Sequence, residues 1–193
     1  MFLTWTRYGP AVFIGGIILT GGTGRRLGGA DKAALTLDGL PLLEHALAAM
    51  AEVPDVVVVG DPTTTSRPVT FTRETPSGGG PALGVLAGLR AFETLPTLVA
   101  VLAVDMPRVT TATFRRLMLD AGRDGALLVD RQGKKQHLCG VYSGAALLAA
   151  APDAIHRGSM KALLKPLKLT KVAAVGKEAR DVDTWEDLKR LSS

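Results

Sequence analysis

Residues 17–32 read IILTGGTGRRLGGADK: an apolar run stops at glycines, two arginines follow, and an Asp-Lys pair closes the stretch. The apolar character extends back to Phe13, so residues 13–19 predict a buried strand that ends in a glycine-rich loop. Glycine has no Cβ, and successive backbone N–H groups in such a loop can approach an anion closely. Arg25, Arg26 and Lys32 add positive charge that suits a polyphosphate.

The composition is typical of a compact α/β protein. Of 193 residues, 47% are hydrophobic and only 5% aromatic, and the net charge of +5 suits an anionic ligand or simply a basic surface. We expect one domain over residues 1–193, with residues 1–13 as a loosely ordered extension. A single cysteine, Cys139, excludes an intrachain disulfide, and with no recognisable signal peptide it indicates the cytoplasm. The apolar N-terminal patch is too short to span a bilayer, so no membrane association is expected.

Short apolar runs alternate with helical patterns along the rest of the chain. Further strands are expected over residues 56–59, 69–72, 98–104, 126–130, 138–142 and 172–175. Helices are expected over residues 40–51, 82–92, 111–122, 145–150, 159–164 and 185–191. This alternation predicts a three-layer α/β fold with a mostly parallel, Rossmann-like sheet, which binds ligands at the carboxyl ends of its strands.

Known phosphate-binding patterns fit the opening loop unequally. The P-loop pattern fails because Ala30 stands where lysine is needed, and the dinucleotide pattern G-x-G-x-x-G fails because Leu27 stands where the third glycine belongs. A reductase loop fits better from Thr20 onward, and Asp61 offers the acidic residue that it needs after the next strand. The chain lacks the Tyr-x-x-x-Lys pair of such reductases.

A longer match starts in the same loop. Residues 18–47, ILTGGTGRRLGGADKAALTLDGLPLLEHAL, resemble the signature of the molybdenum cofactor guanylyltransferases and their MobA-like nucleotidyltransferase relatives. The matching positions are Leu19, Gly21, Gly22, Arg26, Gly28, Asp31, Lys32, Gly39, Pro41, Leu42 and His45. Leu27 replaces the usual methionine, and Thr20 replaces the usual alanine, which adds a hydroxyl where that family's loop passes the base.

Five later segments continue the resemblance to the C-terminus. GGGPALGVLAGL (78–89) is similar to the element beside the nucleotide, LAVDMP (102–107) to the metal-binding strand end, and QHLCGVY (136–142) to a strand on the substrate side. GSMKALL (158–164) resembles a loop and helix near the pterin, and DVDTWEDL (181–188) resembles the closing motif. In that motif both asparagines are aspartates, as in cytidylyltransferase relatives. The resemblance implies the glycosyltransferase-A-like variant of the Rossmann-like fold.

The implied activity is Mg²⁺-dependent transfer of GMP from GTP to molybdenum-loaded molybdopterin, with release of pyrophosphate. The implied partners are GTP and phosphorylated molybdopterin, with proteins that deliver the molybdenum cofactor as further candidates. Alternatives are a cytidylyltransferase on the same pterin, a sugar-phosphate nucleotidyltransferase, an NADP-binding reductase, or a catalytically silent nucleotide-binding partner protein. Nucleic acid is not expected as a ligand, because aromatic residues do not interleave the basic ones.

Nucleotidyl transfer joins two anions, so its catalysis requires alignment and stabilisation of charge. We expect Lys32 and Arg26 to bind the triphosphate and stabilise the leaving pyrophosphate, and Asp105 to hold Mg²⁺. Asp181 or Asp183 would supply a second carboxylate; in an extended chain only one of them faces the metal, and Asp183 is also a candidate cap for the last helix. The predicted nucleotide-binding residues are Leu19, Thr20, Gly21, Gly22, Thr23, Gly24, Arg25, Arg26, Lys32, Asp61, Gly80, Pro81 and Asp105.

Two features have a second interpretation that the sequence leaves open. The basic residues Arg157, Lys161, Lys165, Lys168 and Lys171 either receive a phosphorylated acceptor or form a solvated helix face. His137 either lines the acceptor pocket or is a structural histidine at a strand edge.

Overall fold

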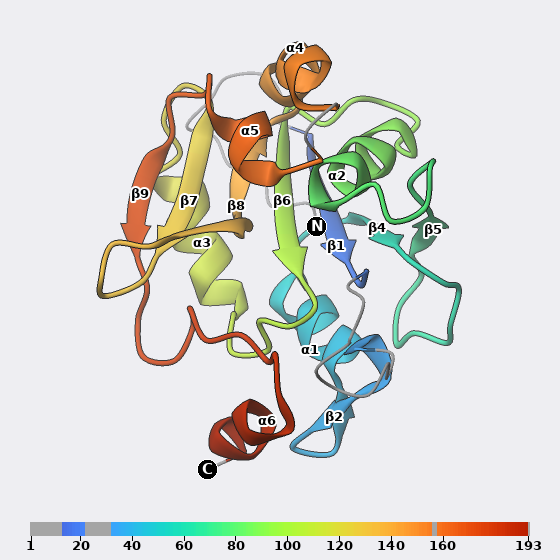
Figure 1. Ribbon diagram of the computed structural model, residues 1–193, viewed down its shortest axis with the longest axis vertical. Helices are drawn as coiled ribbons and strands as arrows, with labels where there is room; N and C mark the ends of the chain where they lie inside the picture. Colours follow the sequence, from blue (N-terminus) through green and yellow to red (C-terminus); the bar gives the residue numbers. More distant parts are fainter. Residues whose placement is uncertain (1–12, 22–31, 156–157, 193) are drawn as a thin grey trace.

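Nine strands form two sheets in the computed structural model, which describes residues 13–21, 32–155 and 158–192 (Figure 1). They are β1 (Ile14–Leu19), β2 (Thr36–Leu37), β3 (Leu40–Pro41), β4 (Asp55–Val59), β5 (Thr70–Thr72), β6 (Leu98–Ala103), β7 (Gly125–Val129), β8 (Lys135–Ser143) and β9 (Thr170–Ala173). Seven of them make the main sheet, in the order β5-β4-β1-β6-β8-β7-β9. Only β8 runs antiparallel to its neighbours β6 and β7 there, which confirms the mostly parallel sheet predicted from the sequence.

Helices cover both faces of the main sheet and so make the predicted three layers. The helices of the described residues are the short 3-10 helix η2 (Lys32–Ala34), α1 (Leu42–Ala49), α2 (Pro81–Arg90), α3 (Thr111–Leu119), α4 (Gly144–Ile155), α5 (Met160–Leu164) and α6 (Trp185–Leu191), of which α1 to α5 lie against the sheet. Successive side chains of a strand point to opposite faces. Ile17 and Leu19 of β1 therefore pack with α2, α4 and α5, whereas Ile18 packs with α1 and α3. Among the described residues, no helix combines the length and the apolar character needed to cross a bilayer.

Most predicted elements are present, with shifted ends. The first helix begins at Leu42 and not at residue 40, because Leu40 and Pro41 pair with Thr36 and Leu37 as a small hairpin. Strand β8 is longer than predicted, because its polar first residues continue the pairing with β7. Helix α4 runs beyond residue 150 to Ile155, although Pro152 lies inside it.

Two glycines allow α2 to approach β1 closely. A Cβ built at Gly84 would lie 3.0 Å from the Leu19 side chain, and one at Gly88 would lie 2.9 Å from two atoms of Ile17. These glycines weaken the helical pattern in the sequence, since glycine disfavours helices. The contact with β1 explains their presence, and it brings the N-terminus of α2 to the carboxyl end of β1.

We predict that Gly88→Val lowers the free energy of unfolding by about 1–3 kcal/mol, because the added side chain overpacks Ile17. Urea denaturation measures this value. The neighbouring Ala87→Val is the matched control; Ala87 is partly exposed, so only the helix-propensity difference of roughly 0.6 kcal/mol should appear. Equal losses in the two variants would contradict the close packing.

Candidate active site

A cavity of about 480 Å³ opens at the carboxyl ends of β1 and β6. Leu19 and Gly21 line it from the end of β1, and Asp105 lines it just beyond β6. Lys32 of η2, Gly80, which precedes α2, and Pro81, the first residue of α2, complete the set of predicted residues that meet there. This is the edge at which open α/β sheets bind their ligands.

A larger cavity, of about 650 Å³, lies at the opposite edge of the sheet. It is bordered by the amino ends of β4 and β5 and by the residues that follow α2, with Phe13, Val57 and Phe92 among its apolar walls. Among the described residues that line it, Asp55 and Glu93 are acidic and none is a lysine or an arginine. The chemistry-bearing side chains are in the smaller cavity, and we therefore assign the site there.

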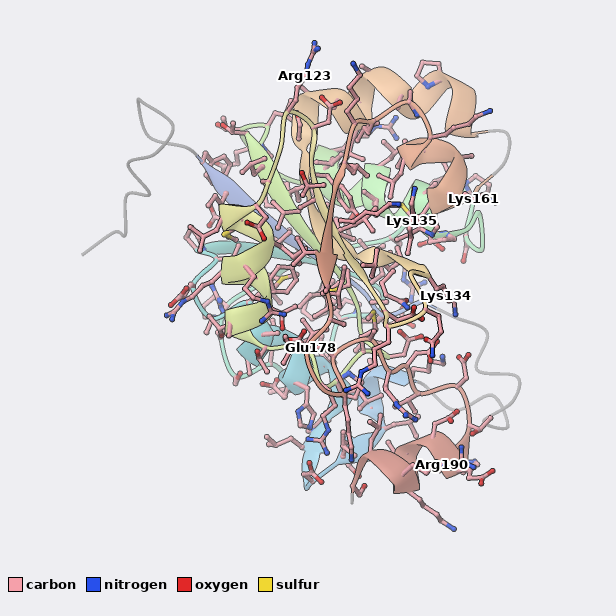
Figure 2. All side chains as sticks on the ribbon, turned by 90° about the vertical axis from the view of Figure 1, so that its left-hand side faces the viewer. Arg123, Lys134, Lys135, Lys161, Glu178 and Arg190 are labelled. Carbon is pink, nitrogen blue, oxygen red and sulfur yellow. The ribbon has the colours of Figure 1, made fainter. Side chains whose placement is uncertain are left out.

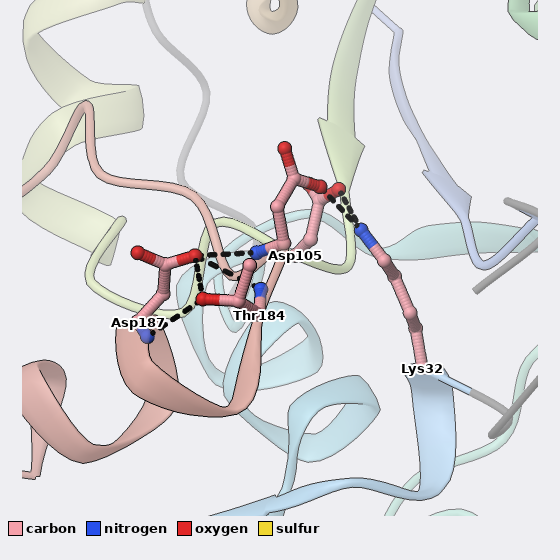
Figure 3. A network of polar contacts seen from close by, with 5 residues as sticks. Lys32, Asp105, Thr184 and Asp187 are labelled. Atoms are coloured by element: carbon pink, nitrogen blue, oxygen red, sulfur yellow. Dashed lines mark hydrogen bonds and ion pairs between the residues drawn. The ribbon is translucent and has the colours of Figure 1, made fainter. Parts of the chain in front are cut away.

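Lys32 joins two carboxylates at this site (Figure 3). Its Nζ donates a hydrogen bond to Asp105 Oδ2 at 3.0 Å and another to Asp183 Oδ1 at 2.9 Å. Only 11% of the Lys32 side chain is exposed. Three segments that are far apart in the sequence thus meet at one ammonium group, and Lys32 and Asp105 share one cleft as predicted.

Burial and charge act in opposite directions on this group of residues. Burial raises the pKa of Asp105, and the nearby Lys32 ammonium only partly offsets that rise. Burial also lowers the pKa of Lys32, but the hydrogen bonds and charges of Asp183 and Asp105 outweigh it, so the net shift of the Lys32 pKa is upward. Lys32 is therefore charged at neutral pH and compensates the carboxylate that is most deeply buried here.

The backbone around Val182 decides which C-terminal aspartate reaches the lysine. The Val182 N–H donates to the carbonyl of Asp105 at 2.8 Å, and the Val182 side chain is fully buried. Asp183 then contacts Lys32, whereas Asp181 is exposed and acts on Asp105 only through its charge. The interpretation of Asp183 as the helix cap is wrong: Thr184 caps α6.

Thr184 and Asp187 form a capping box at the start of α6. The Thr184 hydroxyl accepts a hydrogen bond from the Asp187 N–H, and the Asp187 carboxylate accepts one from the Thr184 N–H. The Thr184 hydroxyl also donates to the Asp187 carboxylate at 2.7 Å, and this bond, ahead of the backbone N–H groups of Asp183 and Thr184, lowers the pKa of Asp187. The Asp183 carboxylate is left to face Lys32 because this pair satisfies the helix end.

Gly80 brings the loop before α2 against the loop before α5. Its φ is +92°, and a Cβ there would lie 2.4 Å from the carbonyl oxygen of Gly158. The same carbonyl accepts a hydrogen bond from the Ala82 N–H at 3.2 Å. Any side chain at position 80 would separate these loops, so the glycine is required by both conformation and close approach.

Residues 16–172 match the family model described as the MobA-like NTP transferase domain. The chain belongs to this family. It is therefore a nucleotidyltransferase, as predicted, and the reductase and silent-partner alternatives are wrong.

Relatives and solved structures agree with this membership. A molybdenum cofactor guanylyltransferase of Acidiphilium cryptum is 37% identical over 149 residues, which cover 73% of this chain and 70% of that protein. Another from Cereibacter sphaeroides is 38% identical over 134 residues, or 66% of this chain and 67% of that one. The structure of molybdopterin-guanine dinucleotide biosynthesis protein A from Archaeoglobus fulgidus shares the fold, with a TM-score of 0.70 and 24% identity over 92% of this chain and 96% of that chain.

Two predicted nucleotide-binding residues of this nucleotidyltransferase do not line the cavity. The Thr20 hydroxyl donates to the carbonyl of Val59 at 3.0 Å. Asp61 is largely exposed and forms an ion pair with Arg73. Five more predicted positions lie outside the described residues: Gly22, Thr23, Gly24, Arg25 and Arg26.

The cavity also includes residues that the sequence analysis missed. Glu74 and Ser77 line it, and the Glu74 carboxylate accepts a hydrogen bond from the Gly78 N–H at 3.1 Å. The glycine-rich run that follows them is the one sequence signal for this loop, since its resemblance to the family's nucleotide-binding element predicts that the loop lies at the site. Nothing in the local pattern distinguished Glu74 from other exposed glutamates.

We predict that Lys32→Met destabilises the fold by about 1–3 kcal/mol, since it leaves the partly buried Asp105 carboxylate without a compensating cation. Urea denaturation at pH 7 and low salt measures the change. Lys165→Met removes an exposed lysine near the end of α5 and serves as the control, with little change expected. If both variants are equally stable, Lys32 does not join the carboxylates in solution.

Proposed function

We propose that this chain transfers GMP from GTP to molybdenum-loaded molybdopterin and releases pyrophosphate, in the cytoplasm. The observation that carries the proposal is the contact of Lys32 with both Asp105, which lines the cavity beside it, and Asp183. The names of the two bacterial relatives support guanine as the base and the molybdenum cofactor as the acceptor.

The residues present fit a magnesium ion. Asp105 and Asp183 offer carboxylate oxygens, the donors that Mg²⁺ prefers, and both already point at one cationic group. No cluster of three metal-binding side chains occurs in the described parts of the chain. This agrees with the usual Mg²⁺ site, in which one or two carboxylates bind and phosphates and waters complete the shell. When bound, the metal would offset negative charge on the two substrates.

The side chains have distinct tasks in the proposed reaction. A phosphate oxygen of the acceptor forms a bond to the α-phosphorus of GTP, and the bond from that phosphorus to the β-phosphate oxygen breaks. Lys32 would turn from the carboxylates to the phosphates and stabilise charge on the leaving pyrophosphate. Asp105 and Asp183 would then hold the metal, and Gly80 would let the backbone approach the nucleotide closely. No covalent intermediate with the protein is needed.

The acceptor would bind on the side of β8 and α5. The pKa of His137 is lowered first by burial and then by the charges of Lys135 of β8 and Lys161 of α5. Figure 2 labels both lysines on the same side of the molecule. These two lysines therefore lie near one another although 26 positions separate them in the sequence. Two lysines beside a neutral histidine form a basic patch that suits a phosphorylated acceptor.

The decisive experiment incubates the purified protein with each nucleoside triphosphate, Mg²⁺ and loaded molybdopterin, and measures pyrophosphate. We expect release with GTP, and a loss on the order of 10²-fold or more in Asp105→Asn with the fold retained by circular dichroism. Release only with CTP would favour the cytidylyltransferase alternative. That alternative is the second candidate because Asp181 and Asp183 stand where the closing motif of the guanylyltransferases has asparagines. If no nucleotide gives pyrophosphate, the proposal is wrong.

We predict that Lys161→Ala raises the pKa of His137 toward its ordinary value of 6.5, because one of the charges that disfavour the imidazolium is removed. The Hε1 resonance in a proton NMR titration reports this pKa, and loss of the signal in His137→Gln assigns it. Lys165→Ala is the control from the end of the same helix. An unchanged His137 pKa in Lys161→Ala would show that Lys161 is not near His137, and would contradict the basic patch proposed for the acceptor.

A further inference from the structure

Glu178 is a buried carboxylate outside the cavity. The residue is 7% exposed and follows β9, where the chain leaves the main sheet. Its Oε1 accepts a hydrogen bond from the Thr113 hydroxyl at 2.6 Å. Its Oε2 accepts from Arg116 at 2.6 Å and from the Val175 N–H at 2.7 Å.

These contacts attach the C-terminal segment to α3. Thr113 and Arg116 lie one turn apart on that helix, and Thr113 is fully buried. The bond from Val175 closes a turn in the segment itself. Burying a carboxylate costs free energy unless it is paired and hydrogen-bonded, and here both oxygens have partners. Hydrogen bonds are directional, so the carboxylate holds the segment in one position relative to α3. A hydrophobic side chain would not fix the position in this way.

The segment that Glu178 holds leads directly to the active site. Four residues later, the Val182 N–H donates to the Asp105 carbonyl, and the next residue, Asp183, accepts the bond from Lys32. The chain between β9 and α6 is therefore attached at two places: to α3 through Glu178, and to the turn after β6 through Val182. Only four residues lie between Glu178 and Asp183, so a shift of the first attachment moves the second carboxylate.

We propose that Glu178 is a positioning residue for the nucleotidyl transfer, which acts by holding Asp183 in line with Lys32 and Asp105. The inference rests on the proposed role of Asp183 in the reaction. Glu178 itself does not line the cavity that holds the nucleotide. Its influence should therefore appear in turnover and not in the binding of the triphosphate.

Glu178→Gln tests this with almost no change in shape. An amide cannot accept bonds at both ends, so Thr113 or the pair Arg116 and Val175 loses its acceptor. We expect kcat to fall about 10-fold, the scale on which misplaced catalytic groups lose rate, with KM for GTP changed less than twofold. Glu52→Gln is the matched control, because Glu52 also binds an arginine of α3, Arg115, but at an exposed place. Its kcat should be unchanged.

A double-mutant cycle with Asp183→Asn separates positioning from general destabilisation. If Glu178 acts through Asp183, then Glu178→Gln should cost little further kcat once Asp183 is replaced. Independent effects that multiply would overturn the inference, as would an unchanged kcat in Glu178→Gln alone. Full activity of Asp183→Asn by itself would overturn the proposed role of Asp183 and this inference with it.

Thr113→Val repeats the cycle if Glu178→Gln does not fold. It removes one donor to Glu178 without changing the size of the side chain greatly, and thermal unfolding followed by circular dichroism checks that the variant is folded. We expect a smaller fall in kcat that also disappears in the Asp183→Asn background. A fall in kcat that persists there would overturn the inference.

Discussion

One ammonium group shared by two carboxylates is the constraint on which the site depends. Lys32 comes from the end of the glycine-rich stretch, Asp105 from the end of β6, and Asp183 from the chain that precedes α6. None of these positions is a neighbour of another in sequence, so the sheet must bring them together. Because charges of opposite sign attract more strongly at a partly buried place than in bulk water, the lysine also stabilises the partly buried Asp105 carboxylate. The same attraction makes this corner of the molecule suitable for phosphates and a metal ion.

The packing of α2 on the sheet complements this electrostatic arrangement. Glycines on one face of the helix let it lie close to β1, and Gly80 at its start lets the neighbouring loop meet Gly158. The loop before α2, which lines the cavity, is therefore in backbone contact with the loop before α5. An enzyme that joins two anions benefits from such a contact, because the geometry between the two reactants is then set by the fold and not by flexible side chains.

Acidic and basic side chains near the site gather at different elements. Asp105, Asp181 and Asp183 gather at the end of β6, whereas Lys135 and Lys161 lie on the side of β8 and α5. Glu178 is a further negative charge, which neither lines the cavity nor faces solvent. Its hydrogen bonds to Thr113 and Arg116 of α3 explain why a buried carboxylate is tolerated there. The attachment of the C-terminal segment through Glu178 is a feature of the folded chain.

The sequence by itself determined the α/β class, the order of the elements, the family, and the residues at strand ends such as Asp105. It could do so because apolar periodicity and short motifs are local properties of a chain. Only the tertiary structure decided that Asp183 and not Asp181 meets Lys32, that Thr184 caps α6, and that Thr20 turns its hydroxyl to Val59. Those outcomes depend on contacts between segments distant in sequence, such as the bond from Val182 to Asp105, and no local pattern encodes which of two alternating side chains such a bond turns inward.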